Sequence, residues 1–182
     1  AEALLFKAGA TDRLGKVLDA NTVCDFDPEE IKRQVSVSLA VAPLIWKDRK
    51  INLIDTPGLF DFAAGMYEGV RAANNVLIAL SGKSGVSVGT EKAYRMAKNA
   101  KPAMFCVTKL DRDNADFYKV LEQLKTVFGP SVCPVVVPVY ESRDVVGYIN
   151  LIEMKAYAYN GKGEAKEVPM PGTGHRVDGL IN

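Results

Sequence analysis

Residues 51–62 read INLIDTPGLFDF, an apolar run that ends on Asp55 and passes into a Thr-Pro-Gly turn. A short apolar run bounded by turn residues predicts a strand over 51–55. Ligands of α/β sheets bind at the carboxyl ends of strands. An aspartate there can contact hydrated Mg²⁺, and the N–H of Gly58 can approach a phosphate. Taken alone, the stretch also fits a polar turn between a strand and a helix.

Strand-like runs and segments of helical spacing alternate along most of the chain. Polar residues 47–50 predict an antiparallel hairpin between the first two strands, and the later alternation predicts an α/β fold with a mostly parallel sheet. The predicted strands cover 35–46, 51–55, 76–80, 103–108 and 134–139. The predicted helices cover 1–8, 63–74, 90–99 and 114–127, with a Gly/Ser loop over 81–89.

Residues 140–182 depart from this alternation. GYINLIEMKAYAY (147–159) predicts a strand, and the residues after it are rich in turn formers and poor in helix formers. We therefore predict one domain over 1–143 and the start of an inserted subdomain over 144–182.

The composition excludes several classes of protein. With 23 basic and 22 acidic residues among 182, the chain lacks the strongly basic charge of a freestanding nucleic-acid binder. No apolar run approaches the roughly 20 residues that span a bilayer, so we expect no membrane partner. The only histidine is His175, so His and Cys ligands cannot assemble a metal cluster.

The three cysteines are scattered along the chain. This spacing is typical of reduced thiols in a cytoplasmic protein without disulfide partners. Cys106 and Cys133 lie in apolar runs, so we expect both to be buried.

A second candidate loop is VTKLDRD (107–113), where Thr108, Lys109 and Asp111 follow a predicted strand. An aspartate can accept two hydrogen bonds from the Watson–Crick edge of guanine, and the stem of a lysine can lie along the base. In isolation the motif is better explained as a solvated charged turn, with Asp111 or Asp113 near the start of a helix.

Together, DTPG and TKLD, each at the end of a strand, resemble the G domain of translational GTPases. Further stretches are similar to elongation factor G in particular, and they extend over almost the whole chain. They are AEALLFKAGATDRLGKV, DFDPEEIKRQVSVS, INLIDTPGLFDF, SGVSVGTEKAYRMA, TKLDRDNADF and VVGYINLIEMKAYAY. The resemblance implies a three-layer P-loop NTPase-type G domain over 1–143, with GTP or GDP and Mg²⁺ as cofactors.

The resemblance also implies roles for single residues. Asp55 would lie in the Mg²⁺ shell, with the Gly58 N–H near the γ-phosphate. Ser36 takes the place of a threonine that meets Mg²⁺, although it also fits a plain edge-strand residue. Thr108, Lys109 and Asp111 would contact guanine. Segments 12–35 and 58–66 would order and disorder with the nucleotide.

The chain departs from the family at its start. The phosphate-binding motif G-x-x-x-x-G-K-[ST] and the strand before it are absent from these residues, so we expect a G domain truncated at its N-terminus. The chain alone is then expected to bind GTP weakly or not at all. Without this strand, apolar residues of the neighbouring strands would be exposed. Either a second copy of the chain or residues before Ala1 would cover them.

Two substitutions also depart from the family. Thr108 stands where the family has asparagine, which weakens guanine preference. Leu59 stands where elongation factors place the histidine that orients the attacking water, and leucine has no donor or acceptor for that role. We therefore expect slow hydrolysis, unless Leu59 merely packs in the hinge and a neighbour such as Asp61 substitutes.

Three functions remain open at this point. The first is the GTPase domain of an elongation factor G-type protein that couples the GTP state to the ribosome. The second is a module of an elongation factor G-like paralogue that binds GTP and hardly hydrolyses it. The third, an α/β domain without a nucleotide role, requires both loops to be coincidental turns.

Overall fold

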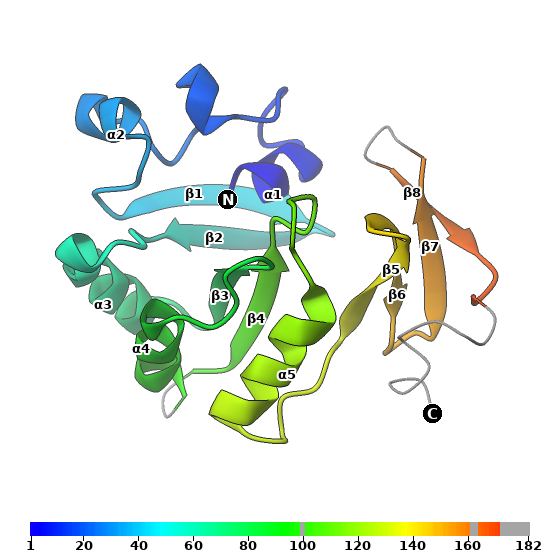
Figure 1. Cartoon of the computed structure of the whole chain (residues 1–182). Coiled ribbons are helices and arrows are strands. Elements are labelled where there is room, and N and C mark those ends of the chain that lie inside the picture. Colours follow the sequence, from blue (N-terminus) through cyan, green and yellow to red (C-terminus); the bar gives the residue numbers. More distant parts are fainter. Residues whose placement is uncertain (99–100, 161–163, 172–182) are drawn as a thin grey trace. The chain divides into compact units, whose positions relative to one another are not determined.

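A computed structural model describes residues 1–98, 101–160 and 164–171 (Figure 1). The chain divides into two compact units, Ala1–Ile78 with Val88–Met104, and Ala79–Ser87 with Phe105–Asn182. Each unit has its own apolar core. The end predicted for one helix, Asn99, and the turn-rich residues 161–163 and 172–182 lie outside the described residues.

The first unit contains the predicted hairpin, which is confirmed. Strands β1 (Ala40–Trp46) and β2 (Arg49–Asp55) pair antiparallel, with Ala40 opposite Asp55. The two turn residues, Lys47 and Asp48, have φ of 48° and 60°, the left-handed values of a tight hairpin turn. Helix α1 (Glu2–Lys7) places Leu5 in a core with Cys24 and the inward-facing residues of β1.

Strand β1 begins later than predicted. Residues 35–39 are not strand, because the N–H groups of Val37 and Ser38 donate to Glu30 Oε1 at 2.9 and 3.0 Å. Glu30 belongs to α2 (Pro28–Arg33), and a short 3-10 helix, η1 (Val17–Asp19), precedes it. The polar segment 12–35 therefore holds local structure that its lack of periodicity did not reveal.

Two helices of the first unit follow β2. The 3-10 helix η2 (Phe60–Phe62) leads into α3 (Ala63–Ala72), and α4 (Val88–Ala97) lies beside α3 (Figure 1). Both predicted helices are confirmed, with ends shifted by a few residues at most where the structure describes them.

Strands β3 (Val76–Ser81) and β4 (Ala103–Thr108) pair parallel. The N–H of Val76 donates to Pro102 O at 2.9 Å and that of Gly82 to Thr108 O at 2.8 Å, so the register advances in the same direction on both strands. Both predicted strands are confirmed. In the second unit, α5 (Phe117–Phe128) packs Val120 and Leu124 against Leu80.

The rest of the second unit is a four-stranded antiparallel sheet, β5-β6-β7-β8. Its strands are β5 (Val136–Glu141), β6 (Asp144–Asn150), β7 (Lys155–Tyr159) and β8 (Ala165–Val168). The prediction of one strand over 147–159 is wrong, because a turn divides it. Asn150 Oδ1 accepts from Ile152 N at 3.0 Å and from Glu153 N at 3.2 Å, which closes that turn. The hairpin of β5 and β6 spans the domain boundary predicted at 143–144, which remains a prediction.

The α/β fold class is confirmed. Among the strand pairs that the structure describes, β3 with β4 is parallel and the others are antiparallel. Within the described ranges, no helix has the length and apolar character needed to cross a membrane.

The cysteines differ from their predicted burial. Cys24 is buried, Cys106 is half-buried and Cys133 is exposed. Cys133 lies between α5 and β5 rather than in a strand, so its apolar neighbours in sequence do not cover it.

Candidate nucleotide-binding loops

The DTPG loop leaves the carboxyl end of β2, as predicted. Asp55 is half-buried, while Gly58 is exposed and free to approach a ligand. A Cβ at Gly69 of α3 would lie 2.5 Å from Thr56 Cγ2, so only glycine allows the helix to pack this closely against the loop. Gly69 was missed by sequence reasoning because the contact joins residues far apart on different elements.

The carboxylate of Asp55 lies near the buried thiol of Cys24, which belongs to the segment before β1. Burial, followed by the negative charges of Asp55 and Glu2, raises the pKa of Cys24 to about 12. The thiol is therefore protonated at neutral pH, and it is not suited to act as a nucleophile or a metal ligand.

Ser36 is also tied to this segment. Its hydroxyl donates to Asp25 Oδ1 at 2.6 Å, and Asp25 is adjacent to Cys24, the residue near Asp55. A carboxylate and a hydroxyl are oxygen ligands of the kind that Mg²⁺ prefers. The described residues contain no group of three or more His, Cys, Asp or Glu side chains arranged to hold a metal. A magnesium ion here would need further oxygens from phosphate or water.

Glu30 organises the chain on both sides of Ser36. The side chain is 2% exposed, and besides Val37 and Ser38 it accepts from Asp27 N at 3.2 Å. Asp27 caps the same helix in return, accepting from Glu29 N at 2.8 Å. The spacing of Asp27 and Glu30 is that of a capping box. This pattern is visible in the sequence and could have predicted the role of Glu30 at the start of the helix.

We expect the stability contributed by Glu30 to depend on pH. Burial raises the pKa of this carboxyl, but hydrogen bonds from the backbone of Ser38, Val37 and Asp27 outweigh burial and hold it below its ordinary value. A depressed folded pKa contributes stability above the unfolded value of about 4.3, and this contribution is lost as the pH falls through the folded pKa.

Replacing Glu30 by glutamine tests this expectation. The glutamine amide would turn an N–H donor toward backbone N–H groups that are themselves donors. We therefore expect the free energy of unfolding in guanidinium to fall by about 1–3 kcal/mol at pH 7, and by less below pH 4. The control is Glu29→Gln, which removes only an exposed ion pair with Arg33. An equal loss at both pH values would contradict the assignment.

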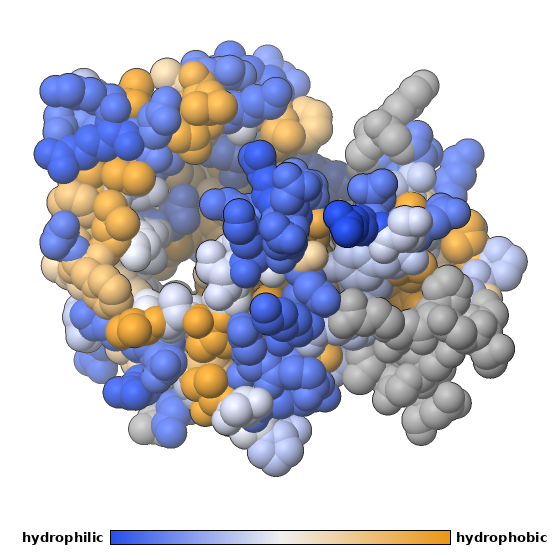
Figure 2. Space-filling view, in the orientation of Figure 1, coloured by the Kyte–Doolittle hydropathy of each residue, from blue (hydrophilic) through white to orange (hydrophobic). Residues whose placement is uncertain are grey.

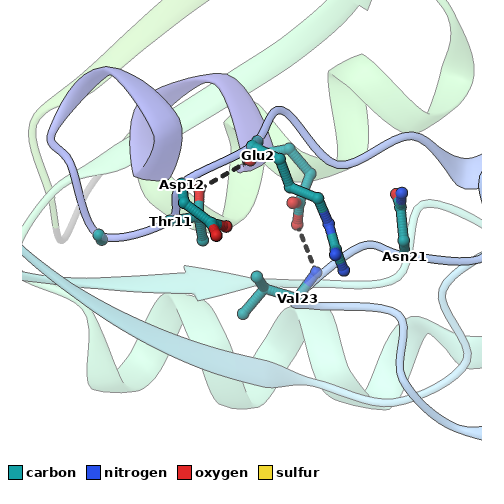
Figure 3. A pocket seen from close by; sticks show the side chains of 7 residues that line it. Glu2, Thr11, Asp12, Asn21 and Val23 are labelled. Carbon is teal, nitrogen blue, oxygen red and sulfur yellow. Dashed lines mark hydrogen bonds between the residues drawn. The ribbon is translucent and has the colours of Figure 1, made fainter.

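A pocket lies beside the N-terminal helix in the first unit (Figure 3). Glu2 Oε1 accepts from Val23 N at 2.8 Å, next to Cys24, whereas Glu2 Oε2 is buried without a hydrogen-bond partner in the described structure. The pocket wall also contains Thr11, Asp12, Arg13 and Asn21. Glu2 thus anchors the segment that contains Cys24 and Asp25, the partner of Ser36.

The TKLD loop leaves the carboxyl end of β4, as predicted. The Thr108 hydroxyl donates to Leu80 O at 3.1 Å and so ties β4 to β3. Lys109 has φ of 57°, which is uncommon for a residue with a side chain and turns the loop sharply. The Lys109 and Asp111 side chains are exposed. Asp111 Oδ2 lies 3.9 Å from Arg112 Nε, a long and solvated ion pair.

Gly82 holds the TKLD loop from the neighbouring strand. Besides its bond to Thr108 O, its carbonyl accepts from Asp116 N at 3.0 Å. A Cβ here would lie 2.6 Å from Leu110 Cδ2, so a larger residue would displace the Leu110 side chain. Helix α5 begins at Phe117, and its N-cap Asp116 accepts from Tyr118 N and Lys119 N, while Asp111 and Asp113 lie shortly before this cap.

Leu59 lies between the DTPG turn and η2. Its backbone is extended, with φ of −82° and ψ of 143°, and its side chain is 48% exposed. Leu59 O accepts from Phe62 N at 3.1 Å. Because the Leu59 side chain is exposed, it does not fill a core. The structure therefore does not favour the alternative in which Leu59 only packs against its neighbours.

Comparison with known proteins identifies the family. The model of the elongation factor Tu GTP binding domain matches residues 1–178. The chain belongs to this family. Together with similar elongation factor G sequences, this match confirms the predicted resemblance to the G domain of elongation factor G, and the domain is a GTP-binding one by family.

Individual relatives of this elongation factor G domain are similar over most of the chain. Elongation factor G 1 of Syntrophomonas wolfei is 35% identical over 162 residues, which are 88% of this chain and 24% of that protein. An elongation factor G-like protein of Thermotoga maritima is 35% identical over 92% of this chain and 24% of its own length. The chain thus spans about a quarter of the length of these relatives.

A solved structure supports the same assignment. The crystal structure of ttk003000868 from Thermus thermophilus superposes with a TM-score of 0.87 and 39% sequence identity. The match covers 93% of this chain and 26% of that one.

Proposed function

We propose that this chain is the guanine-nucleotide-binding part of an elongation factor G-type translation factor that hydrolyses GTP slowly. The observation that carries the proposal is the DTPG loop, which leaves β2 of a chain of this family and has Leu59 directly after it. In this reading residues 1–143 form the G domain and residues 144–182 begin its insert. The full protein would act on the ribosome in the cytoplasm.

Asp55 and Ser36 would hold Mg²⁺, because a carboxylate and a hydroxyl are oxygen ligands of the kind that this ion prefers. The ion would neutralise charge on the phosphates. The chain's own residues would do the positioning: Gly58 presents its N–H to the γ-phosphate, and Asp25 orients Ser36. On nucleotide binding Asp25 would release the Ser36 hydroxyl, which links segment 12–35 to the nucleotide state.

Lys109 and Asp111 would read the base, with the lysine stem along the ring and the carboxylate on the Watson–Crick edge. Thr108 contributes less, because its hydroxyl already donates to Leu80 O. Asp111 then carries most of the specificity for guanine.

A second candidate is a module that binds GTP and hardly hydrolyses it. Leu59 favours this candidate, since it offers no donor or acceptor to an attacking water. Single-turnover hydrolysis with and without ribosomes separates the two.

Calorimetry with GTP, GDP and ATP tests nucleotide binding. Residues 1–182 contain no G-x-x-x-x-G-K-[ST] motif, so we expect residues 1–182 alone to bind GTP at best weakly. We expect the full protein that carries them to bind GTP and GDP more tightly than ATP. Its binding of GTP should depend on Mg²⁺. Micromolar GTP affinity of residues 1–182 alone would contradict the first expectation, and equal affinity for ATP would contradict the proposed function.

In the absence of nucleotide, the isolated residues 1–182 should also self-associate. Leu77 of β3 is 53% exposed and Ile51 of β2 is 43% exposed, which supports this part of the proposal.

A further inference from the structure

Lys92 lies between two aromatic rings of the first unit. Its Nζ is 5.5 Å from the centroid of the Phe60 ring and 5.5 Å from that of Tyr67. Both distances fall within the range of a cation–π interaction. Phe60 begins η2, two residues after Gly58, while Tyr67 lies on α3 and Lys92 on α4. One ammonium group therefore links the loop after DTPG to two helices.

The position of Phe60 depends on this contact more than on burial. The Phe60 side chain is 57% exposed and that of Tyr67 is 49% exposed, so neither ring is held by a surrounding core. Figure 2 shows apolar surface over the region of α3. The neighbour of Lys92 in sequence, Glu91, pairs with Arg95 at 3.2 Å, so it does not neutralise the ammonium.

The elements on either side of the loop are fixed by other means. Close packing at Gly69 fixes α3 against Thr56, and Pro57 is buried. Between these points, Gly58 and Leu59 are exposed, and Phe60 is the next side chain with a partner on another helix. The backbone of Gly58 and Leu59 is thus held from its carboxyl side by the ring of Phe60.

We propose that Lys92 is a positioning residue for the DTPG loop, acting through Phe60 on the backbone of Gly58 and Leu59. The proposal rests on the proposed function, in which Gly58 N–H meets the γ-phosphate. Because GDP lacks that phosphate, the contact sets the preference for GTP over GDP. A loop already in place binds GTP without a further ordering cost.

The test compares nucleotide affinities of variants of the full protein. Lys92→Met keeps the length of the stem and removes the charge, and we expect it to lower the GTP-over-GDP preference by about two- to five-fold with unchanged GDP affinity. Lys92→Arg retains a cation and should restore the preference. The matched control, Lys98→Met, removes an exposed lysine at the end of the same helix and should change neither affinity.

A second measurement is independent of nucleotide. Amide hydrogen exchange of residues 58–66 should be several-fold faster in Lys92→Met than in the wild-type protein or Lys98→Met, while exchange in α5 is unchanged. Equal losses of GTP and GDP affinity, or unchanged exchange in 58–66, would overturn the proposal. A protein that binds no guanine nucleotide would overturn the proposed function, and exchange would still decide whether Lys92 holds Phe60.

Discussion

Replacing Leu59 by histidine should accelerate GTP hydrolysis by the full protein by about 10²–10⁴-fold, the range that a positioned acid–base group supplies. An imidazole can accept a hydrogen bond from the attacking water, which leucine cannot do. The acceleration should require the neutral imidazole, so it should fall away as the pH drops below about 6.5.

The structure makes Leu59 suitable for this substitution. Its side chain is 48% exposed and its backbone is extended, so a histidine fits without a clash or an unusual φ. The free energy of unfolding should therefore change little, within about 0.5 kcal/mol. Single-turnover hydrolysis of bound GTP, with and without ribosomes, gives the rate.

Two controls separate a specific effect of Leu59→His from alternatives. Val88→His introduces the same group at a position that is 70% exposed on the first unit, and it should not change the rate. Asp61→Asn tests whether this neighbour already substitutes for the missing histidine. Fast ribosome-stimulated hydrolysis by the wild-type protein, abolished by Asp61→Asn, would refute the role given to Leu59.

Strands with a strong local signal were predictable from the sequence. The runs at 76–80 and 103–108 are continuously apolar, and the structure places β3 at Val76–Ser81 and β4 at Ala103–Thr108. The hairpin of β1 and β2 was equally predictable, because a short polar turn joins two apolar runs.

The errors arose where one side chain competes with the backbone ladder. Glu30 takes the N–H groups of Val37 and Ser38, which ends the predicted strand before β1. Asn150 takes those of two residues that follow it and divides the predicted strand 147–159. Alternation of apolar residues does not report such hydrogen bonds, although the capping box at Asp27 was a usable hint.

The candidate site was predictable only in part. Asp55 and Asp111 follow apolar runs, so their places at strand ends could be read directly from the sequence. Their surroundings could not, because Cys24, Gly82 and Lys92 act on residues distant in sequence. Such contacts depend on tertiary packing, which one sequence without relatives does not specify.

Replacing Asp111 by asparagine should shift the base preference of the full protein from guanine toward xanthine. The carboxylate can accept from the ring N–H and the exocyclic amine of guanine, whereas the amide offers a donor that matches the second carbonyl of xanthine. Two hydrogen bonds to a charged group correspond to a change of about 10²–10⁴-fold in relative affinity. Competition between GTP and xanthosine triphosphate, measured by calorimetry, gives this ratio.

The structure predicts that this change acts on recognition and not on folding. The Asp111 side chain is 78% exposed, and the loop around it is held by Gly82 and by the cap at Asp116, neither of which the substitution touches. Asp113→Asn is the matched control, since it removes the same charge from an exposed position two residues on. If both variants keep full guanine discrimination, Asp111 does not read the base. TKLD would then be a solvated turn that connects β4 to α5, and Gly82 would have only a structural role in holding it.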